Sequence, residues 1–250
     1  AIESDAIETR TQYGLFDELQ FNIAECTDTN QLNPFANQTI REAMNYAIDR
    51  NYVAQELYNG LAVPKYVTLA EAGADRARFA KEIRQIEAQY AYDFDKANEI
   101  ISGEMEAMGA TMEGGVWTYN GQPVNLIFLI RNEDTRLVIG GYIASQLEDM
   151  GFTVERVERT SAELSPIWNE TDPALCEWHL YTGAWSQTVV DRESTFSFEQ
   201  YYTNRVLPWP LWAIYDPPEE LDEAALRIYQ NDFTSVEERA ELIRTALPLT

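Results

Sequence analysis

The sequence predicts an α/β fold in which helices flank a mixed sheet. The prediction depends mainly on three patterns between Val124 and Val157, where an apolar strand, a helix and a second strand follow one another. The first strand pattern, VNLIFLIR, is almost entirely apolar, which is typical of strands buried on both faces. Because a strand, a helix and a strand of this length form a βαβ crossover, the two strands should be parallel and their connection right-handed.

The segments before this unit are predicted from their periodicity. Residues 13–24 mix apolar and polar side chains at short period and indicate one or two strands that enter the domain. Within 39–60 apolar residues recur at helical spacing, and we expect this helix to break near Asp49. We expect an extended segment followed by another helix within residues 61–92.

Two turn signals predict the next elements. Asp93 should cap a helix that ends at Gly109, because aspartate favours the N-cap and glycine favours the residue after a helix. Asn120 and Gly121 are a strong signal for a two-residue turn, so WTYNGQPVNLIFLIR predicts a hairpin.

The C-terminal part should add a third strand and more helices. A helical stretch, SAELSPIWNE, leads to the strand pattern CEWHLYTGAW. Residues 206–220 combine two tryptophans with four prolines and no regular period, which indicates a connecting loop. Two amphipathic helices, LDEAALRIYQ and SVEERAELIRTAL, should close the chain, the second capped by Thr234 or Ser235.

The composition excludes several classes of protein. With 45% hydrophobic residues the chain can bury a large core, so global disorder is excluded. Asp and Glu number 42 against 18 Lys and Arg, giving a net charge of -24 that would repel a nucleic acid backbone. No apolar run approaches the roughly 20 residues of a membrane-spanning helix.

The two cysteines do not predict a metal site. Cys26 and Cys176 lie far apart in the sequence, and the chain has a single histidine, so the usual zinc ligands are missing. If the protein is exported, these cysteines can instead form a disulfide. Cys176 and His179 are three residues apart on a predicted strand and should point to opposite faces, which argues against a Cys-His nucleophile.

No catalytic residues or cofactor are predicted. The sequence contains no G-x-S-x-G, Walker loop or H-E-x-x-H motif. Pairs of acidic residues occur throughout so acidic a chain, so none is singled out as a general acid and base.

One long segment resembles a known family. The segment NPFANQTIREAMNYAIDRNYVAQELYNGLAVP contains a short loop, an R-x-A-x-x-Y-A-I-D-R helix and a G-x-A-x-P exit, formed by Arg41, Ala43, Tyr46, Ala47, Ile48, Asp49, Arg50, Gly60, Ala62 and Pro64. It resembles the family 5 extracellular solute-binding proteins, the dipeptide and oligopeptide group. The similarity continues through YDFDKANEII, NGQPVNLIFLIR, the helix to MGFTVE and the strand ending in TGAW, and covers most of residues 31–245.

The resemblance implies one lobe of a two-lobed, periplasmic-binding-protein-like fold that encloses its ligand between the lobes. Residues 1–30 would then form strands and a loop that enter the domain, and 31–206 the ligand-binding lobe. Residues 207–250 would form a connecting loop and C-terminal helices, in the same lobe or at the return to the missing partner lobe. We therefore expect a fragment of a longer protein, as the absence of an initiating Met also suggests.

The resemblance also implies a function. It implies the substrate-binding component of an ABC importer, which captures a peptide or similar small solute and delivers it to an ABC permease in the membrane. Such a protein is extracytoplasmic, periplasmic or lipid-anchored at the cell surface in its full-length form, and is not an enzyme. The alternatives are a binding protein for an oligosaccharide or a metal complex, a glycan-processing enzyme and a purely structural module.

Two loops at the carboxyl ends of predicted strands are candidate ligand-binding sites, because ligands of parallel α/β sheets bind there. In the first, Arg131 to Thr135, Asn132 can cap the following helix and the free backbone N–H groups can donate hydrogen bonds to a carboxylate. An ordinary solvated cap is the alternative interpretation of that loop.

The second loop follows the strand CEWHLYTGAW. Here Trp185 can stack on a ligand while the next polar residues offer hydrogen bonds, and the candidate residues are Trp185, Ser186, Gln187, Thr188 and Asp191. The family commonly has Gly-Trp-x-Ala-Asp-Tyr at this place, and its acidic residue can hold the amino group of a peptide. In this chain Thr188 or Val189 stands there, and Asp191 can substitute only from a shifted position.

We expect Trp185 to lie at the surface that faces the cleft. The other tryptophans considered should pack in the core or between lobes; they are Trp117, Trp168, Trp178, Trp209 and Trp212.

Overall fold

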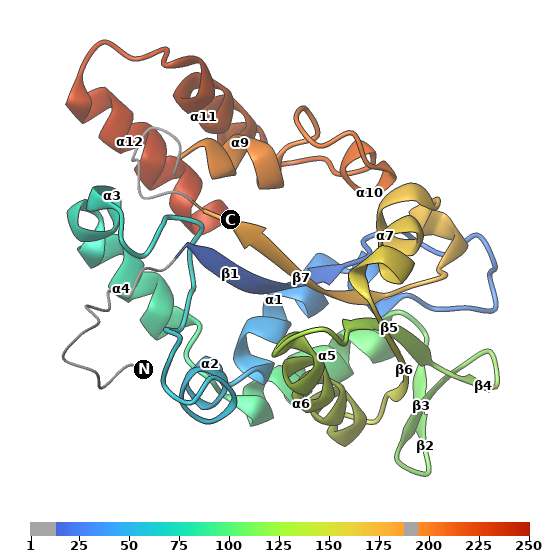
Figure 1. Ribbon diagram of the computed structural model, residues 1–250. Coiled ribbons are helices and arrows are strands. Elements are labelled where there is room, and N and C mark those ends of the chain that lie inside the picture. Colours follow the sequence, from blue (N-terminus) through green and yellow to red (C-terminus); the bar gives the residue numbers. More distant parts are fainter. Residues whose placement is uncertain (1–13, 188–194) are drawn as a thin grey trace.

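The computed structural model describes residues 14–187 and 195–250. Within them the main sheet has four strands in the order β1-β7-β5-β6 (Figure 1). The strands are β1 (Leu15–Phe21), β5 (Asn125–Arg131), β6 (Thr153–Arg159) and β7 (Leu180–Ser186). Strand β5 is parallel to both of its neighbours, whereas β1 pairs antiparallel with β7. The predicted mixed α/β fold is therefore confirmed.

The βαβ unit also forms as predicted. Helix α6 (Arg136–Asp149) connects β5 to β6, and the two strands are parallel with Leu129 opposite Val157. Helix α7 (Ser161–Glu170) then connects β6 to β7. Because alternate residues of a strand face opposite sides, Phe128 packs in the same core as α6 whereas Leu129 packs with α7. The two helices consequently cover opposite faces of the sheet.

The first face carries the largest core. Helices α1 (Gln38–Ala47) and α5 (Phe94–Ala107) join α6 there. Asp93 caps α5 through a hydrogen bond from the Lys96 backbone, and Gly109 follows the helix with φ +88°, as predicted. The helix break is confirmed as well, since the Asp49 side chain caps a new turn, α2 (Arg50–Tyr52), which continues into η2 (Val53–Leu57).

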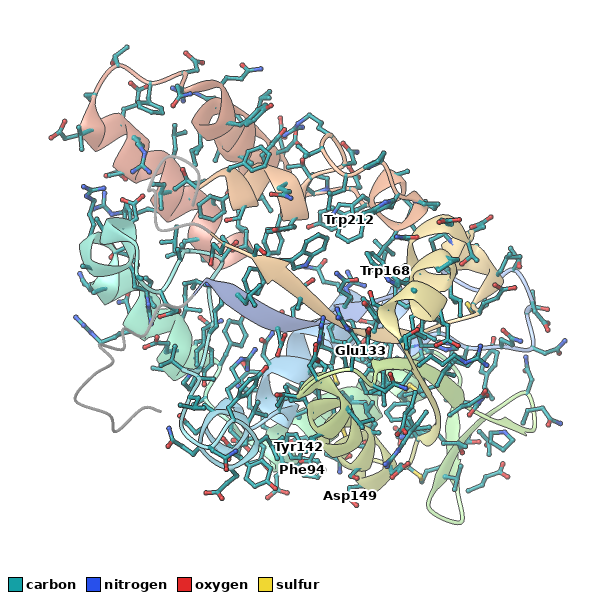
Figure 2. The ribbon with its side chains drawn as sticks, in the orientation of Figure 1. Phe94, Glu133, Tyr142, Asp149, Trp168 and Trp212 are labelled. Atoms are coloured by element: carbon teal, nitrogen blue, oxygen red, sulfur yellow. A yellow bond between two sulfur atoms is a disulfide. The ribbon has the colours of Figure 1, made fainter. Side chains whose placement is uncertain are left out.

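Aromatic residues dominate the core on the second face. Trp168 of α7 stacks on Tyr181 with ring centroids 5.0 Å apart. Residues 206–220, predicted as a loop, contain the short helix α10 (Pro210–Ala213), whose Trp212 points to the same core as Trp168 (Figure 2). Burial of this side chain explains why so proline-rich a connection stays close to the sheet.

A third core lies among helices at one end of the sheet (Figure 1). It joins α4 (Ala80–Gln89) to α9 (Phe196–Tyr202), α11 (Glu219–Gln230) and α12 (Val236–Ala246). Helix α3 (Ala74–Arg78) precedes α4 and contacts α12 through the ion pair between Asp75 and Arg239. Ser235 accepts the capping hydrogen bond of α12, whereas α9 was not predicted. Short 3₁₀ turns occur at η1 (Pro34–Ala36), η3 (Pro173–Leu175) and η4 (Leu247–Leu249). No helix in the described ranges is both long and apolar enough to cross a membrane.

The predicted hairpin was partly wrong. Asn120 and Gly121 both have positive φ and form the expected turn, but they join β3 (Val116–Tyr119) to the very short β4 (Gln122–Pro123). These strands and β2 (Thr111–Glu113) make a separate sheet. The chain then leaves the hairpin, because the apolar side chains of β5 are buried in the main sheet instead.

The third strand begins later than predicted. Cys176 has a left-handed conformation, with φ 51°, and ends the turn η3, so β7 starts only at Leu180. The expectation that Cys176 and His179 point apart was therefore wrong: their ligand atoms and that of Cys26 lie within 4.8 Å of one another. A disulfide joins Cys26 to Cys176, and both sulfurs are used in it.

His179 is a buried, neutral residue, and its protonation should destabilise the fold. The imidazole Nδ1 accepts a hydrogen bond from the Ile127 backbone at 3.0 Å, and burial lowers the pKa of His179 to about 4. The unfolded chain, with a histidine pKa near 6.5, binds this proton first as the pH falls. We expect neutral His179 to contribute fully to the free energy of unfolding above about pH 6.5. About 3 kcal/mol of that free energy should be lost as the pH falls to 4.

The matched variant is His179→Asn, whose side-chain oxygen can replace Nδ1 as acceptor but does not titrate. Chemical denaturation at a series of pH values should show a steeper loss of stability for the wild type than for the variant between pH 6.5 and 4. Parallel pH profiles for the two proteins would contradict a neutral, buried His179.

Candidate ligand-binding crevice

A crevice opens at the carboxyl end of the sheet, where β5 and β7 separate. The two strands pair through Phe128 with Leu180 and Leu129 with Tyr181. Beyond these pairs the Arg131 backbone N–H donates to the Thr182 hydroxyl, at 2.9 Å, instead of to a carbonyl. The cavity there has about 140 Å³, and its walls include Gln20, Arg131, Arg136, Trp168, Tyr181 and Trp185.

The two arginines in this crevice are already neutralised by neighbouring acids. The Arg131 Nε lies 2.8 Å from Glu133, and the guanidinium of Arg136 binds Asp134 through two nitrogens at 2.9 and 2.6 Å. The bond from Arg136 holds the pKa of the Asp134 carboxyl below its usual value. These ion pairs fix the arginines along the rim and leave little excess positive charge.

The predicted cap of α6 was wrong in detail. Asn132 is exposed and donates to the Glu158 carbonyl at 3.4 Å, and Thr135 makes no capping bond through its side chain. The Asp134 carboxylate instead accepts from the Arg136 backbone N–H at 3.1 Å. A carboxylate of the chain itself thus occupies the helix N-terminus that a ligand carboxylate was expected to use.

Trp185 lies in the crevice wall as a half-buried residue. Its ring centroid is 4.8 Å from that of Tyr201 and 5.9 Å from that of Trp209, and its indole N–H donates to Glu18. The indole is therefore fixed by neighbours on two sides while one part still lines the cavity.

The residues after Trp185 are placed differently. Ser186 is exposed at the end of β7. Gln187 is engaged by another segment, since its amide donates to the Thr68 carbonyl and its oxygen accepts from Lys65 Nζ at 3.1 Å. The candidate residues Thr188 and Asp191 lie outside the described residues.

Gln20, which lines the crevice, and its hydrogen-bond partner Glu18 were missed from the sequence. Both are on β1, on the face that carries Trp185, and the Gln20 amide donates to Glu18 at 2.6 Å. Burial raises the pKa of Glu18. Gly183 is required opposite them, because a Cβ there would lie 3.0 Å from the Gln20 amide nitrogen. Two polar residues at alternate positions of LFDELQF were the only signal for this arrangement.

A larger hollow of about 340 Å³ lies elsewhere, between α11, α12 and Arg78. None of its lining residues belongs to a strand of the main sheet, whereas ligands of such sheets bind at the carboxyl ends of the strands. Its two arginines, Arg78 and Arg239, are both bound to Asp75. We therefore take the smaller crevice as the candidate site.

The sequence matches one protein family over residues 3–205, described as the middle region of the bacterial extracellular solute-binding proteins, family 5. The chain belongs to this family. The resemblance noted in its loop, helix and exit motif is thereby confirmed. No curated protein sequence matches the chain.

Solved structures of two-lobed binding proteins share the fold. They include NikZ from Campylobacter jejuni in complex with Ni(L-His), with a TM-score of 0.64 and 16% identity over 95% of this chain and 43% of that one. For an oligopeptide-binding protein from Thermotoga maritima, with mannohexaose bound, the TM-score is 0.65 and the identity 14%, over 94% of this chain and 42% of that one. For an oligopeptide-binding protein from Thermus thermophilus, in complex with a pentapeptide, the TM-score is 0.63 and the identity 18%, over 94% of this chain and 39% of that one. The chain thus spans less than half the length of these proteins.

Proposed function

We propose that this chain is the ligand-contacting lobe of the substrate-binding component of an ABC importer, which captures a peptide or similar small solute. The crevice between β5 and β7 is the observation that best supports the proposal. The helix after β5 and the helix before β7 lie on opposite faces of the sheet. Crevices of this kind, at the carboxyl ends of strands, are the usual ligand sites of open α/β sheets.

The crevice is suited to form one half of a ligand-binding site that is enclosed between two lobes. A cavity of about 140 Å³ is too small for a peptide, so most of the ligand would project beyond it. The solved relatives are more than twice as long as the matched region, which leaves room for a second lobe. Family membership and the Cys26–Cys176 disulfide both favour an extracytoplasmic location, followed by delivery to a membrane permease.

The proposal is tested by calorimetry on the full-length parent protein and on the 250-residue chain. We expect at least one member of a panel of short peptides, oligosaccharides and nickel-histidine to bind the parent, and to bind the chain at least about a hundredfold more weakly, because half of the contacts are lost. Submicromolar binding of a peptide by the chain alone would contradict the division into two lobes. Hydrolysis of a generic glycoside or peptide by the protein would contradict the proposal that it binds its ligand without catalysing a reaction.

Trp185→Phe should weaken ligand binding by the parent by about 1–3 kcal/mol, because the ring that lines the crevice becomes smaller and its bond to Glu18 is lost. The matched control is Trp117→Phe on β3, which also removes an indole bond, donated to the Met150 carbonyl at 3.0 Å. Calorimetry should show unchanged affinity for that control and a lower melting temperature. Equal ligand affinities for both variants and the wild type would show that Trp185 does not contribute to ligand binding.

A further inference from the structure

We propose that the hollow between α11, α12 and Arg78 is a second binding site, for a small carboxylate that carries an apolar tail. The hollow has a volume of about 340 Å³, as small-molecule pockets commonly have. It lies among the helices at one end of the sheet (Figure 1), and the described residues that line it include none that lines the crevice. Binding at this second site therefore does not depend on the proposed function.

The wall of the hollow carries a surplus positive charge, in a chain whose net charge is -24. Of the described residues that line it, two are arginines, Arg78 and Arg239, and none is acidic. Both guanidinium groups bind the single buried carboxylate of Asp75, whereas each arginine of the crevice has an acidic partner of its own. Because two cations share one anion here, a ligand with one negative charge would balance the wall.

Arg78 has N–H donors available for such a ligand. Its side chain is 42% exposed and, in the described part of the chain, its only side-chain hydrogen bond goes from one terminal nitrogen to Asp75. Arg239 is more buried and uses both of its terminal nitrogens on Asp75, at 3.2 and 2.6 Å. A guanidinium group has five N–H donors in a planar fork that suits a carboxylate. Arg78 can therefore donate to a ligand while Arg239 stays bound to Asp75.

The other side of the wall is apolar, which favours a ligand with a hydrocarbon tail. Ile228 of α11 is buried and belongs to the core among the C-terminal helices. Phe233, in the loop between α11 and α12, and Val236, the first residue of α12, also line the hollow, and Val236 is 62% exposed. A tail that covers these side chains would remove apolar surface from water. A bare inorganic anion would not gain this contribution.

The acidic residues near the hollow do not cancel its surplus charge. Asp232 and Glu238, before α12 and in its first turn, both lie within ion-pair distance of Arg227. Glu237 is exposed and is not part of the wall. At an ionic strength of 0.15 M, exposed charges more than about 8 Å away are largely screened. The charge of the wall, rather than the net charge of the chain, should therefore decide which ligands bind.

The site is complete within the 250-residue chain, where hexanoate can serve as the probe. The δ1 methyl signal of Ile228 in a ¹H–¹³C spectrum reports on the hollow, and Ile228→Val assigns that signal. In 0.15 M sodium chloride, hexanoate should shift the signal saturably and bind at least about tenfold more tightly than 1-hexanol, hexylammonium or acetate. No saturable shift, or an equal affinity for any of the other three compounds, would overturn the proposal.

Arg78→Gln removes the surplus charge and leaves the ion pair between Asp75 and Arg239 in place. It should weaken hexanoate binding by about tenfold and leave the affinity for 1-hexanol unchanged. The matched control is Arg84→Gln, an exposed change on α4 with the same effect on net charge, which should alter neither affinity. Equal hexanoate affinities for these two variants would show that Arg78 does not bind the carboxylate.

Val236→Asp places a carboxylate in the wall at an exposed position. An acidic residue in the first turn of a helix is favourable, so the melting temperature should not fall. Hexanoate binding should nevertheless weaken by about tenfold relative to Val236→Asn, which has the same size but no charge. Equal hexanoate affinities for the aspartate and asparagine variants would overturn the placement of the ligand carboxylate in this hollow.

Discussion

Removing the Cys26–Cys176 disulfide is expected to lower the free energy of unfolding by about 5 kcal/mol. The bond joins residues 150 positions apart, and closing so long a loop removes much of the conformational entropy of the unfolded chain. It also ties the loop after β1 to the turn that precedes β7, next to the buried His179. Denaturation with and without reductant measures the effect.

The double variant Cys26→Ala, Cys176→Ala is the matched control. Its stability should equal that of the reduced wild type and should not respond to reductant. Two reactive thiols in unreduced, denatured wild-type protein would contradict the disulfide.

Asp75→Asn should cost about 3–5 kcal/mol of stability, because it breaks a buried ionic cluster. Asp75 is 1% exposed at the start of α3 and binds Arg78 as well as Arg239 of α12, the latter at 2.6 Å. Neutralising the carboxylate leaves the Arg239 guanidinium, itself largely buried, without its counter-charge. Thermal or chemical denaturation would show the loss.

Glu241→Gln is the matched control, because it removes a carboxylate from α12 that pairs with Arg244 at the surface. That pair is exposed, and its loss should change stability by less than about 0.5 kcal/mol. Similar small losses for both variants would mean that the cluster around Asp75 does not hold α3 to α12.

The elements that the sequence predicted well are those with strong local signals. The apolar β5, the helix α6 with buried residues at helical spacing, and the capped α5 each follow from periodicity or from a single capping residue. The errors occurred where tertiary contacts determine the secondary structure. Residues 176–179 look like a strand, but the disulfide and the turn η3 hold them outside β7.

The candidate site was predicted only in part. Arg131 and Trp185 follow from the rule that ligands bind at the carboxyl ends of strands, and the structure places both in one crevice. Gln20 could not be found in this way, because β1 is antiparallel and reaches the crevice only through its pairing with β7. Asn132 was misassigned because sequence alone does not show that Asp134 lies closer to the helix start.

The most direct test is a crystal structure of the full-length parent protein with a peptide bound. It should show the peptide against the Trp185 ring in the crevice between β5 and β7, covered by a second lobe. A peptide bound elsewhere, with this crevice filled only by solvent, would contradict the account.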